Sequence, residues 1–317
     1  MKKIKYITAI ILFLPLIVFG NLDTTNFERH GSSIELKPYF VIQKLSLKLG
    51  GTSNFVTYEP GITGSAGLNL AYKFIDISLA RSVVSQKMGS LNLESKYYDI
   101  RINSYQRRIG FDINFQWFIG FSIADFPENL PDTLKQFVQP NLDLVNYGIN
   151  FLYSLNKKMS LKSIYKYRER QVKSAGSIII GLYQNYTELS YSSTIFPDEI
   201  TTEYNVVNSE NRGDFYSIIP TVGYQYNFVR KNLHFSPFVS VGIGGQYQDY
   251  TSDSKGNFKG FKRASRVNFN LPLGYNGNKT YYGVIARYDQ TVAKIQKTSS
   301  MDYSLVSLKF FIGIRFK

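Results

Sequence analysis

The chain has 317 residues and a formal net charge of +14, and aromatic residues make up 16% of it. It contains no cysteine, which excludes a disulfide scaffold, a thiol nucleophile, a cysteine-ligated zinc site and a lipoprotein anchor. With only two histidines, His30 and His234, a histidine-rich metal centre is not expected, and we predict no metal and no cofactor.

The first twenty residues have the three parts of a secretory signal peptide. Three of the first five residues are lysines, an apolar stretch covers 7–18, and Gly20 suits the position before a cleavage site. The apolar stretch is shorter than the ~20 residues that a membrane-spanning helix needs. We therefore expect a cleaved signal peptide over 1–20, a periplasmic leader over 21–33 and one barrel domain over 34–317. Cleavage removes three positive charges, so the net charge falls from +14 to +11.

Period-two alternation of apolar and polar residues dominates the mature chain, which predicts β-strands. The clearest segments are 109–119, 147–155, 267–275 and 306–316. A soluble sandwich would turn the apolar face inward, whereas a membrane barrel turns it toward lipid. Strands of ~10 or more residues suit a tilted crossing of a bilayer. We therefore predict an all-β fold, a single antiparallel transmembrane β-barrel.

Short and long connections alternate along the chain, as in outer-membrane barrels. Short connections are expected near 73–75, 106–107, 156–158, 230–232 and 276–278. Long connections are expected over 50–63, 84–94, 121–141, 191–213, 249–260 and 293–300. This alternation predicts twelve strands with both ends of the chain in the periplasm.

Residues 158–190 are too long for one simple strand. They predict either a long strand rising above the membrane or a strand pair with a further strand near 200–207. Ten or fourteen strands therefore stay open beside twelve.

The last strand resembles the signal that bacterial barrel-assembly machinery reads, with apolar residues at every second position and an aromatic residue near the end. The residues concerned are Phe310, Ile312, Ile314 and Phe316, followed by Lys317. This pattern predicts the barrel-assembly machinery as a partner. A membrane barrel would also contact outer-membrane lipid, and basic residues near strand ends could contact anionic lipopolysaccharide.

Turning the apolar face toward lipid sends charged residues into the lumen, because Arg or Lys at the bilayer midplane costs ~2–4 kcal/mol. The expected lumen residues are Lys44, Lys48, Lys73, Arg101, Arg108, Lys162, Lys166, Arg168, Arg266, Arg287, Lys309 and Arg315, with Asp76, Asp99, Asp112 and Asp289. Their positive excess predicts an anion-preferring pore if water passes through. Alternatively, these charges pair with one another and fill a narrow barrel.

A charged cluster of Glu169, Arg170 and Lys173 precedes the small residues 174–177. Small residues let a backbone or a ligand approach closely. The cluster therefore predicts either lumen charges that narrow the barrel or bind a ligand, or a bulge where a strand bends. We hypothesise that Glu169 and Arg170 take part in ion pairs of the lumen.

Several segments resemble a family of Bacteroidetes outer-membrane proteins that is catalogued only as a domain of unknown function. They are GLNLAYKFIDISLA (67–80), ERQVKSAGSIIIG (169–181) and VGYQYNFVRKNLHFSPFVSVGIG (222–244). The resemblance covers roughly 35–317, and Gln171 to Ser177 is its most specific part. It implies an outer-membrane barrel and supplies no activity, substrate or catalytic residue.

No phosphate loop, HExxH motif or calcium loop occurs in the sequence. His234 and Ser236 could form a catalytic pair near the membrane rim, or be polar residues near a strand end. The basic residues are scattered along strands in an exported chain, which argues against nucleic-acid binding. The acidic segment 193–214 is expected in an outer loop that binds cations or a partner, or is simply solvated.

Three functions stay open. The first is a non-enzymatic barrel that is structural or a passive pore. The second is a barrel enzyme acting on lipid or another envelope substrate near the rim. The third is a surface-binding protein acting through its long outer loops.

Overall fold

The computed structural model describes residues 25–31, 34–50, 55–88, 93–125, 138–191, 212–252, 256–295 and 300–316. The predicted signal peptide and most of the acidic segment 193–214 lie outside these residues. Within the described ranges, no helix has the length and apolar character needed to cross a membrane.

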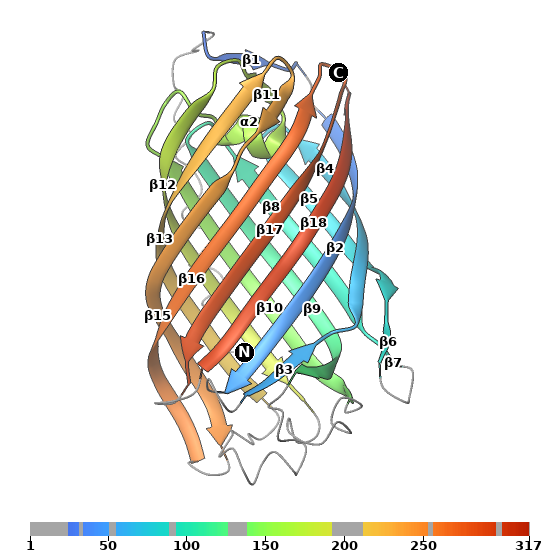
Figure 1. The fold of residues 1–317 in the computed structure, drawn as a ribbon, viewed down its shortest axis with the longest axis vertical. Helices are drawn as coiled ribbons and strands as arrows, with labels where there is room; N and C mark the ends of the chain where they lie inside the picture. The colour runs from blue at the N-terminus through green and yellow to red at the C-terminus, as the bar shows by residue number, and fades with distance from the viewer. Residues whose placement is uncertain are drawn as a thin grey trace.

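Twelve antiparallel strands form a closed ring, as the alternation predicted (Figure 1). In ring order they are β2 (Ile34–Gly50), β4 (Ile62–Tyr72), β5 (Ile75–Ser85), β8 (Lys96–Tyr105), β9 (Ile109–Asp125), β10 (Val138–Ser154), β12 (Ala175–Ser190), β13 (Arg212–Arg230), β15 (Phe238–Ser252), β16 (Gly256–Asn276), β17 (Thr280–Lys294) and β18 (Ser300–Phe316). The last strand pairs with the first, β18 with β2, and this pairing closes the ring.

The predicted short connections gather at one end of the barrel, at the top of Figure 1, which we call the short-turn end. The strand β1 and the C-terminal end of the chain, marked C, also lie there (Figure 1). The longer connections gather at the other end, the long-loop end. The short strands β6 (Lys87–Met88) and β7 (Leu93–Glu94) pair with each other outside the ring. The short strand β14 (Leu233–Phe235) lies within the ring, between β13 and β16.

Residues 158–190 contain one strand of the ring and so form neither a single long strand nor a strand pair, and the further strand expected near 200–207 lies outside the described residues. The segment from 155 to 174 forms an insertion, which we call the plug, and β12 begins only at Ala175. The plug contains the short helix α2 (Leu161–Lys166), which begins after Ser160 and is followed by Tyr167 in the left-handed conformation with φ 62°. It also contains β11 (Glu169–Gln171), which pairs with β1 (Phe27–Arg29) of the leader.

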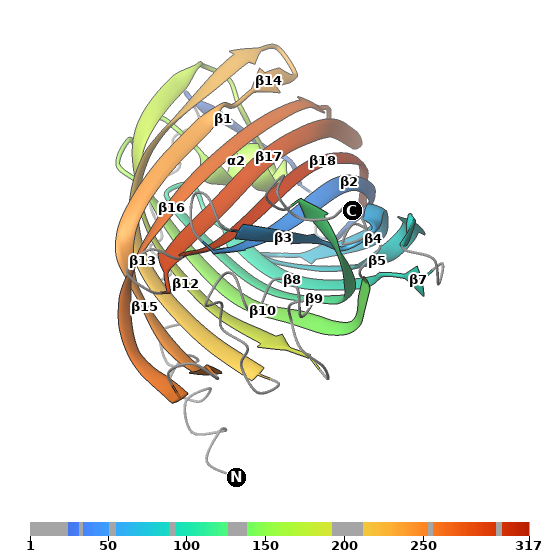
Figure 2. The same cartoon turned by 60° about the horizontal axis from the view of Figure 1, so that its bottom comes forward.

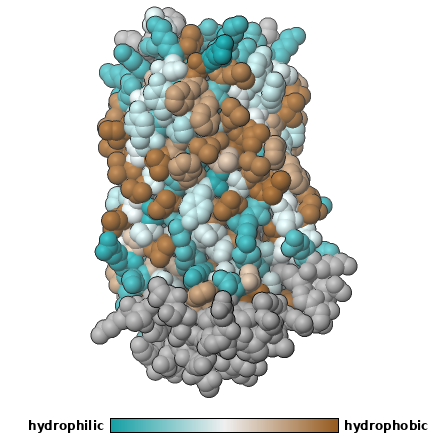
Figure 3. Space-filling model, in the orientation of Figure 1, coloured by the Kyte–Doolittle hydropathy of each residue, from teal (hydrophilic) through white to brown (hydrophobic). Residues whose placement is uncertain are grey.

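The outer wall has an apolar belt toward the short-turn end (Figure 3). Large apolar side chains such as Leu79 (56% exposed) and Ile243 (60% exposed) point away from the lumen. Exposing such an apolar belt to water would be unfavourable, whereas contact with lipid is favourable. A closed β-barrel is one of the two structures that can cross lipid, because its strands pair their backbone groups with one another. The fold is therefore that of a transmembrane β-barrel.

The polarity of the wall reverses toward the long-loop end, and β2 shows where. Phe40 and Ile42 point outward, but the next outward side chain is Lys44, 67% exposed and paired with Glu59, while Leu45 points inward and is buried. The buried residues of this half form one cluster, which we call the apolar core. It consists of Leu45, Leu47, Leu49, Val56, Tyr58, Ile62, Tyr97, Phe118, Phe121, Ile123, Leu142, Leu144, Leu189, Tyr191, Phe215, Tyr250, Ile295, Met301 and Leu305.

This reversal corrects the predicted lumen positions of Lys44 and Lys48, which lie on the outward face of β2. The strands have up to 21 residues, about twice the ~9–11 that a tilted crossing requires. The long-loop half therefore has the construction of a water-soluble barrel, polar outside and apolar inside.

The ring also narrows toward the long-loop end. The strand β3 (Phe55–Glu59) pairs with both β2 and β9 and so bypasses β4, β5 and β8. Figure 2 shows β3 crossing between its neighbours at this end. In the described residues the wall there closes through ten strands: β2, β3, β9, β10, β12, β13, β15, β16, β17 and β18. Ten strands is close to the ~8 at which side chains fill the interior and well below the ~16–18 that leave a channel.

Candidate functional site

The plug lies inside the barrel at the short-turn end. Leu161 and Ile164 of α2 are fully buried, in one apolar cluster with Tyr105, Leu152 and Phe238 from three different strands. Ser160 caps the start of α2, because its hydroxyl accepts a hydrogen bond from the Ser163 N–H at 3.0 Å. This bond satisfies a donor that has no partner within the helix. The helix α2 therefore packs against the inner face of the barrel wall.

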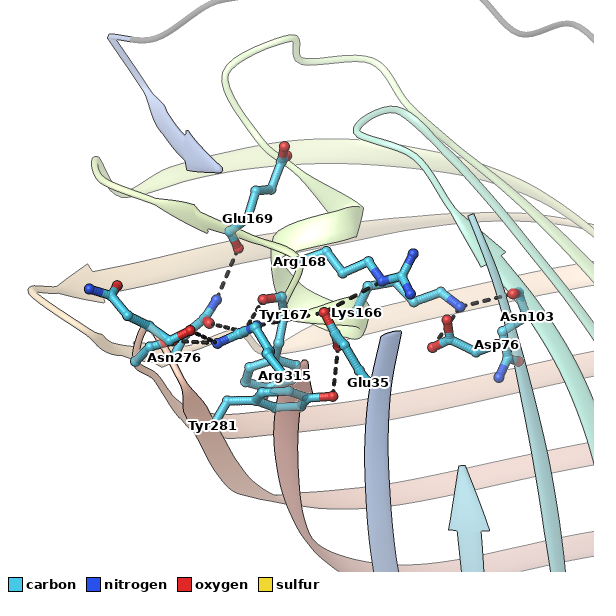
Figure 4. A network of polar contacts seen from close by, with 12 residues as sticks. Glu35, Asp76, Asn103, Lys166, Tyr167, Arg168, Glu169, Asn276, Tyr281 and Arg315 are labelled. Atoms are coloured by element: carbon cyan, nitrogen blue, oxygen red, sulfur yellow. Dashed lines mark hydrogen bonds and ion pairs between the residues drawn. The ribbon is translucent and has the colours of Figure 1, made fainter. Parts of the chain in front are cut away.

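Lys166 ties the end of α2 to the wall. Its Nζ lies 2.8 Å from Asp76 Oδ2 on β5 and donates to the Asn103 carbonyl on β8, also at 2.8 Å (Figure 4). Burial lowers the pKa of Lys166 to about 8, and the Asp76 carboxylate opposes this shift. The amine is therefore charged at neutral pH, and its ion pair with Asp76 holds.

Glu35 of β2 is the centre of a second set of contacts. Its side chain is 1% exposed and lies 3.5 Å from Arg168 Nε of the plug and 3.6 Å from Arg315 Nε of β18. The other carboxylate oxygen accepts a hydrogen bond from the Tyr281 hydroxyl at 2.8 Å. Two buried cations from different elements thus share one buried carboxylate (Figure 4).

Tyr167 fills the space beside this cluster. Its ring stacks on Tyr281 with the centroids 5.0 Å apart, and its carbonyl accepts a hydrogen bond from Arg315. A Cβ at Gly274 on β16 would lie only 2.3 Å from the Tyr167 hydroxyl. The wall therefore needs glycine at this position for the plug to fit.

The leader covers the plug. Its strand β1 pairs with β11, and the side chain of Phe27 is buried under the guanidinium of Arg107, which lies 4.4 Å from the ring centroid. The same Arg107 forms an ion pair with Glu169 at 3.1 Å. Arg170 contacts Glu28 of the leader, also as an ion pair. The plug is thus fixed to the wall on one side and to the leader on the other.

A polar cavity of about 200 Å³, which we call the chamber, separates the plug from the apolar core. Its lining includes Tyr165 and Lys166 of the plug, and Tyr303 and Leu305 next to or within the core. Its charged lining residues are six cations, Lys37, Arg101, Lys166, Arg266, Arg287 and Lys309, and four acids, Asp76, Asp99, Asp112 and Asp289.

The structure places most of the sequence-predicted site residues at the chamber or the plug. These are Arg101, Asp112, Lys166, Arg168, Glu169, Arg287 and Arg315. Glu169 forms an ion pair with Arg107, which lies in the turn between β8 and β9. Arg170 pairs instead with Glu28 of the leader, whose side chain is half exposed.

Several predicted lumen positions are wrong. Arg108 donates to the carbonyls of Ser154 and Leu155 at the short turns, and Lys173 and Lys73 are exposed in connections. Lys162 lies on α2 and is not part of the chamber lining. Arg108, Lys73 and Lys173 lie at the short-turn rim, where a charged side chain reaches water without entering the lumen.

Glu35 and Lys37 were missed, although both are buried inside the barrel. They alternate with Leu36 and Pro38 on β2, so the same alternation that predicted the other strands could have placed them inward. The predicted assembly residues Phe310, Ile312, Ile314 and Phe316 lie on the outer face of β18, between 41% and 49% exposed.

His234 and Ser236 lie at the short-turn end, on the inward face and next to the plug, rather than on the lipid-facing rim. The Ser236 hydroxyl donates to Asn227 at 2.6 Å, and the His234 ring packs on Tyr167. His234 Nε2 has no hydrogen-bond partner among the described residues. Among all the residues that the structure describes, no group of three or more His, Cys, Asp or Glu residues is arranged to hold a metal ion.

A family model described as a domain of unknown function, DUF4421, matches residues 23–316. No curated protein matches the chain at a significant level.

The fold of the chain is similar to that of three solved structures. The outer-membrane protease OmpT of Escherichia coli is 8% identical, over 90% of this chain and 97% of its own, with a TM-score of 0.40. The translocator domain of the autotransporter NalP of Neisseria meningitidis is 12% identical, over 99% and 95%, with a TM-score of 0.38. The toluene transporter TodX of P. putida is 7% identical, over 90% of each chain, with a TM-score of 0.29.

Proposed function

The chain belongs to DUF4421, a family described as a domain of unknown function, and we propose that it is a non-enzymatic barrel of the outer membrane that is closed at rest. Its short turns face the periplasm and its long loops face outward, which is the usual orientation of such barrels. In this setting it contacts outer-membrane lipid and lipopolysaccharide, and barrel-assembly machinery inserts it.

One observation carries this proposal: the lumen is occupied at both ends. The plug fills the periplasmic end with buried ion pairs such as Lys166–Asp76. The apolar core fills the outer end, where Phe118 and Phe121 are 0% exposed. An apolar constriction also keeps out water and hydrated ions. A passive pore would need an open path past both, so a structural role is favoured over passive transport.

Flux measurements on liposomes test the closed state. Liposomes containing the purified wild-type barrel are expected to admit chloride and small sugars no faster than protein-free liposomes, because both barriers are in place. A porin in parallel liposomes serves as the positive control. Uptake that rises in proportion to the amount of this protein would contradict the proposal.

Surface binding is the second candidate function, and the outer half of the barrel favours it. This half has a polar outer wall and a filled interior, and the strands that lead into the long connections extend through it beyond the apolar belt. Arg212, Glu188 and Asp214 form an ion-pair cluster near the base of one such loop. A partner that binds the intact barrel and not one with shortened loops would support this candidate.

A further inference from the structure

We propose that the chamber is a binding site for a small oxyanion with two negative charges, such as a sulfate, a phosphate or a short dicarboxylate. The inference goes beyond a closed structural barrel, because it assigns the enclosed space a ligand. It depends on the charges that line the chamber, on their burial and on the size of the cavity.

The charges in the chamber do not cancel. Three of its cations pair with aspartates: Arg101 with Asp99 at 2.8 Å, Lys166 with Asp76 at 2.8 Å, and Arg266 with Asp289. The fourth aspartate, Asp112, accepts a hydrogen bond from Tyr105 and interacts electrostatically with Arg287. Six cations against four acids leave a net charge of +2.

Lys37, Arg287 and Lys309 form no ion pair or hydrogen bond within the described residues. Lys37 is only 9% exposed and lies 5.5 Å from the Phe311 ring centroid, and the Lys309 Nζ lies 3.5 Å from that of Tyr39. An aromatic ring attracts a cation but does not neutralise it. Of the three, Lys37 is buried, whereas Arg287 and Lys309 are partly exposed and Arg287 has Asp112 as a nearby counter-charge. A buried charge without a partner costs several kcal/mol, so an anion held beside Lys37 and Lys309 would remove that cost for Lys37.

The cavity limits the size of this anion. Its volume of about 200 Å³ is below the roughly 300–1,000 Å³ typical of pockets for drug-sized ligands. The surrounding donors are two ammonium groups and one guanidinium, which bind oxyanions by charge-assisted hydrogen bonds. A divalent oxyanion matches both the volume and the surplus of two charges.

Equilibrium unfolding in urea tests this site without requiring passage through the plug, since the unfolded chain exchanges its ligand freely. The full-length mature barrel is unfolded and refolded in detergent micelles with increasing sodium sulfate or sodium succinate, or with sodium chloride at equal ionic strength.

Sulfate also stabilises proteins generally because it is excluded from their surface. The test is therefore the difference between variants. The double variant Lys37→Met, Lys309→Met removes two cations, and Lys44→Met removes an outward cation of the same strand.

For the wild type and Lys44→Met, we expect sulfate to raise the urea midpoint above the chloride value by an amount that saturates. The double variant is expected to keep only the non-saturating rise, and each single variant to bind about tenfold more weakly. Replacing a buried, unpaired cation by an apolar side chain leaves folding intact or improves it, and Lys309 is partly exposed and unpaired within the described residues, so the double variant is expected to fold in chloride.

Equal rises in all variants, or midpoints in both sulfate and succinate that never exceed chloride for the wild type, would overturn the anion site. If succinate saturates and sulfate does not, the ligand class narrows to dicarboxylates. Leakage of wild-type liposomes would overturn the closed barrel and would not affect these midpoints, so the two proposals fail separately.

Discussion

Removing the plug alone is expected to leave the barrel without measurable current, because the apolar core still blocks the outer end. In this variant a short Gly-Ser turn replaces residues 157–174. A second variant replaces Tyr58, Phe118 and Phe121 of the core by serine and is also expected to stay closed, because the plug remains. Only the combination opens both barriers, and planar-bilayer recordings are expected to show stepwise currents for it alone.

The current of the combined variant is expected to prefer anions. Without Lys166 the chamber lining still has five cations and four acids, since Lys166 is one of the six, and a positive lumen raises the local anion concentration. The reversal potential in a salt gradient measures this preference. Because each buried aromatic residue contributes about 3–5 kcal/mol, the folded state of every variant is checked by its electrophoretic migration without heating. Current from the plug deletion alone would show that the core is no barrier.

Replacing Glu35 by glutamine is expected to destabilise the barrel by about 3–5 kcal/mol, because it leaves the two buried guanidiniums of Arg168 and Arg315 without their shared carboxylate. The urea midpoint in detergent measures the loss. The matched control is Glu59→Gln, whose partner Lys44 is 67% exposed, and whose removal is expected to cost at most about 1 kcal/mol. Equal midpoints for the two variants would contradict the role given to Glu35.

The membrane-facing half of the barrel could be predicted from the sequence because its outward side chains are apolar and alternate strictly. This signal located β9, β10, β16 and β18, and the short and long connections supplied the count of twelve. The long-loop half follows a different rule, since its outer wall meets water. In β2 the apolar positions change from even numbers at Phe40 and Ile42 to odd numbers at Leu45 and Leu47. That change of phase is readable in the sequence and marks the point where the polarity reverses.

The plug could not be predicted in the same way. Its helix has only six residues, fewer than two turns, so the helical period is too short to recognise. The charged cluster around Glu169 was a correct sign of an unusual segment, but its partners Arg107 and Glu28 lie far away in the chain. Such pairings depend on the closed ring, which brings distant strands to one end.

Labelling of single cysteines tests the closed chamber most directly, because the natural chain has no cysteine. Ser307 lines the chamber, and Ser304 lies three residues away on the opposite face of the same strand. In the folded barrel, a polar maleimide is expected to react with Ser304→Cys and to leave Ser307→Cys unreacted until the protein is unfolded. Rapid labelling of Ser307→Cys in the folded protein would show an open lumen and would contradict the account.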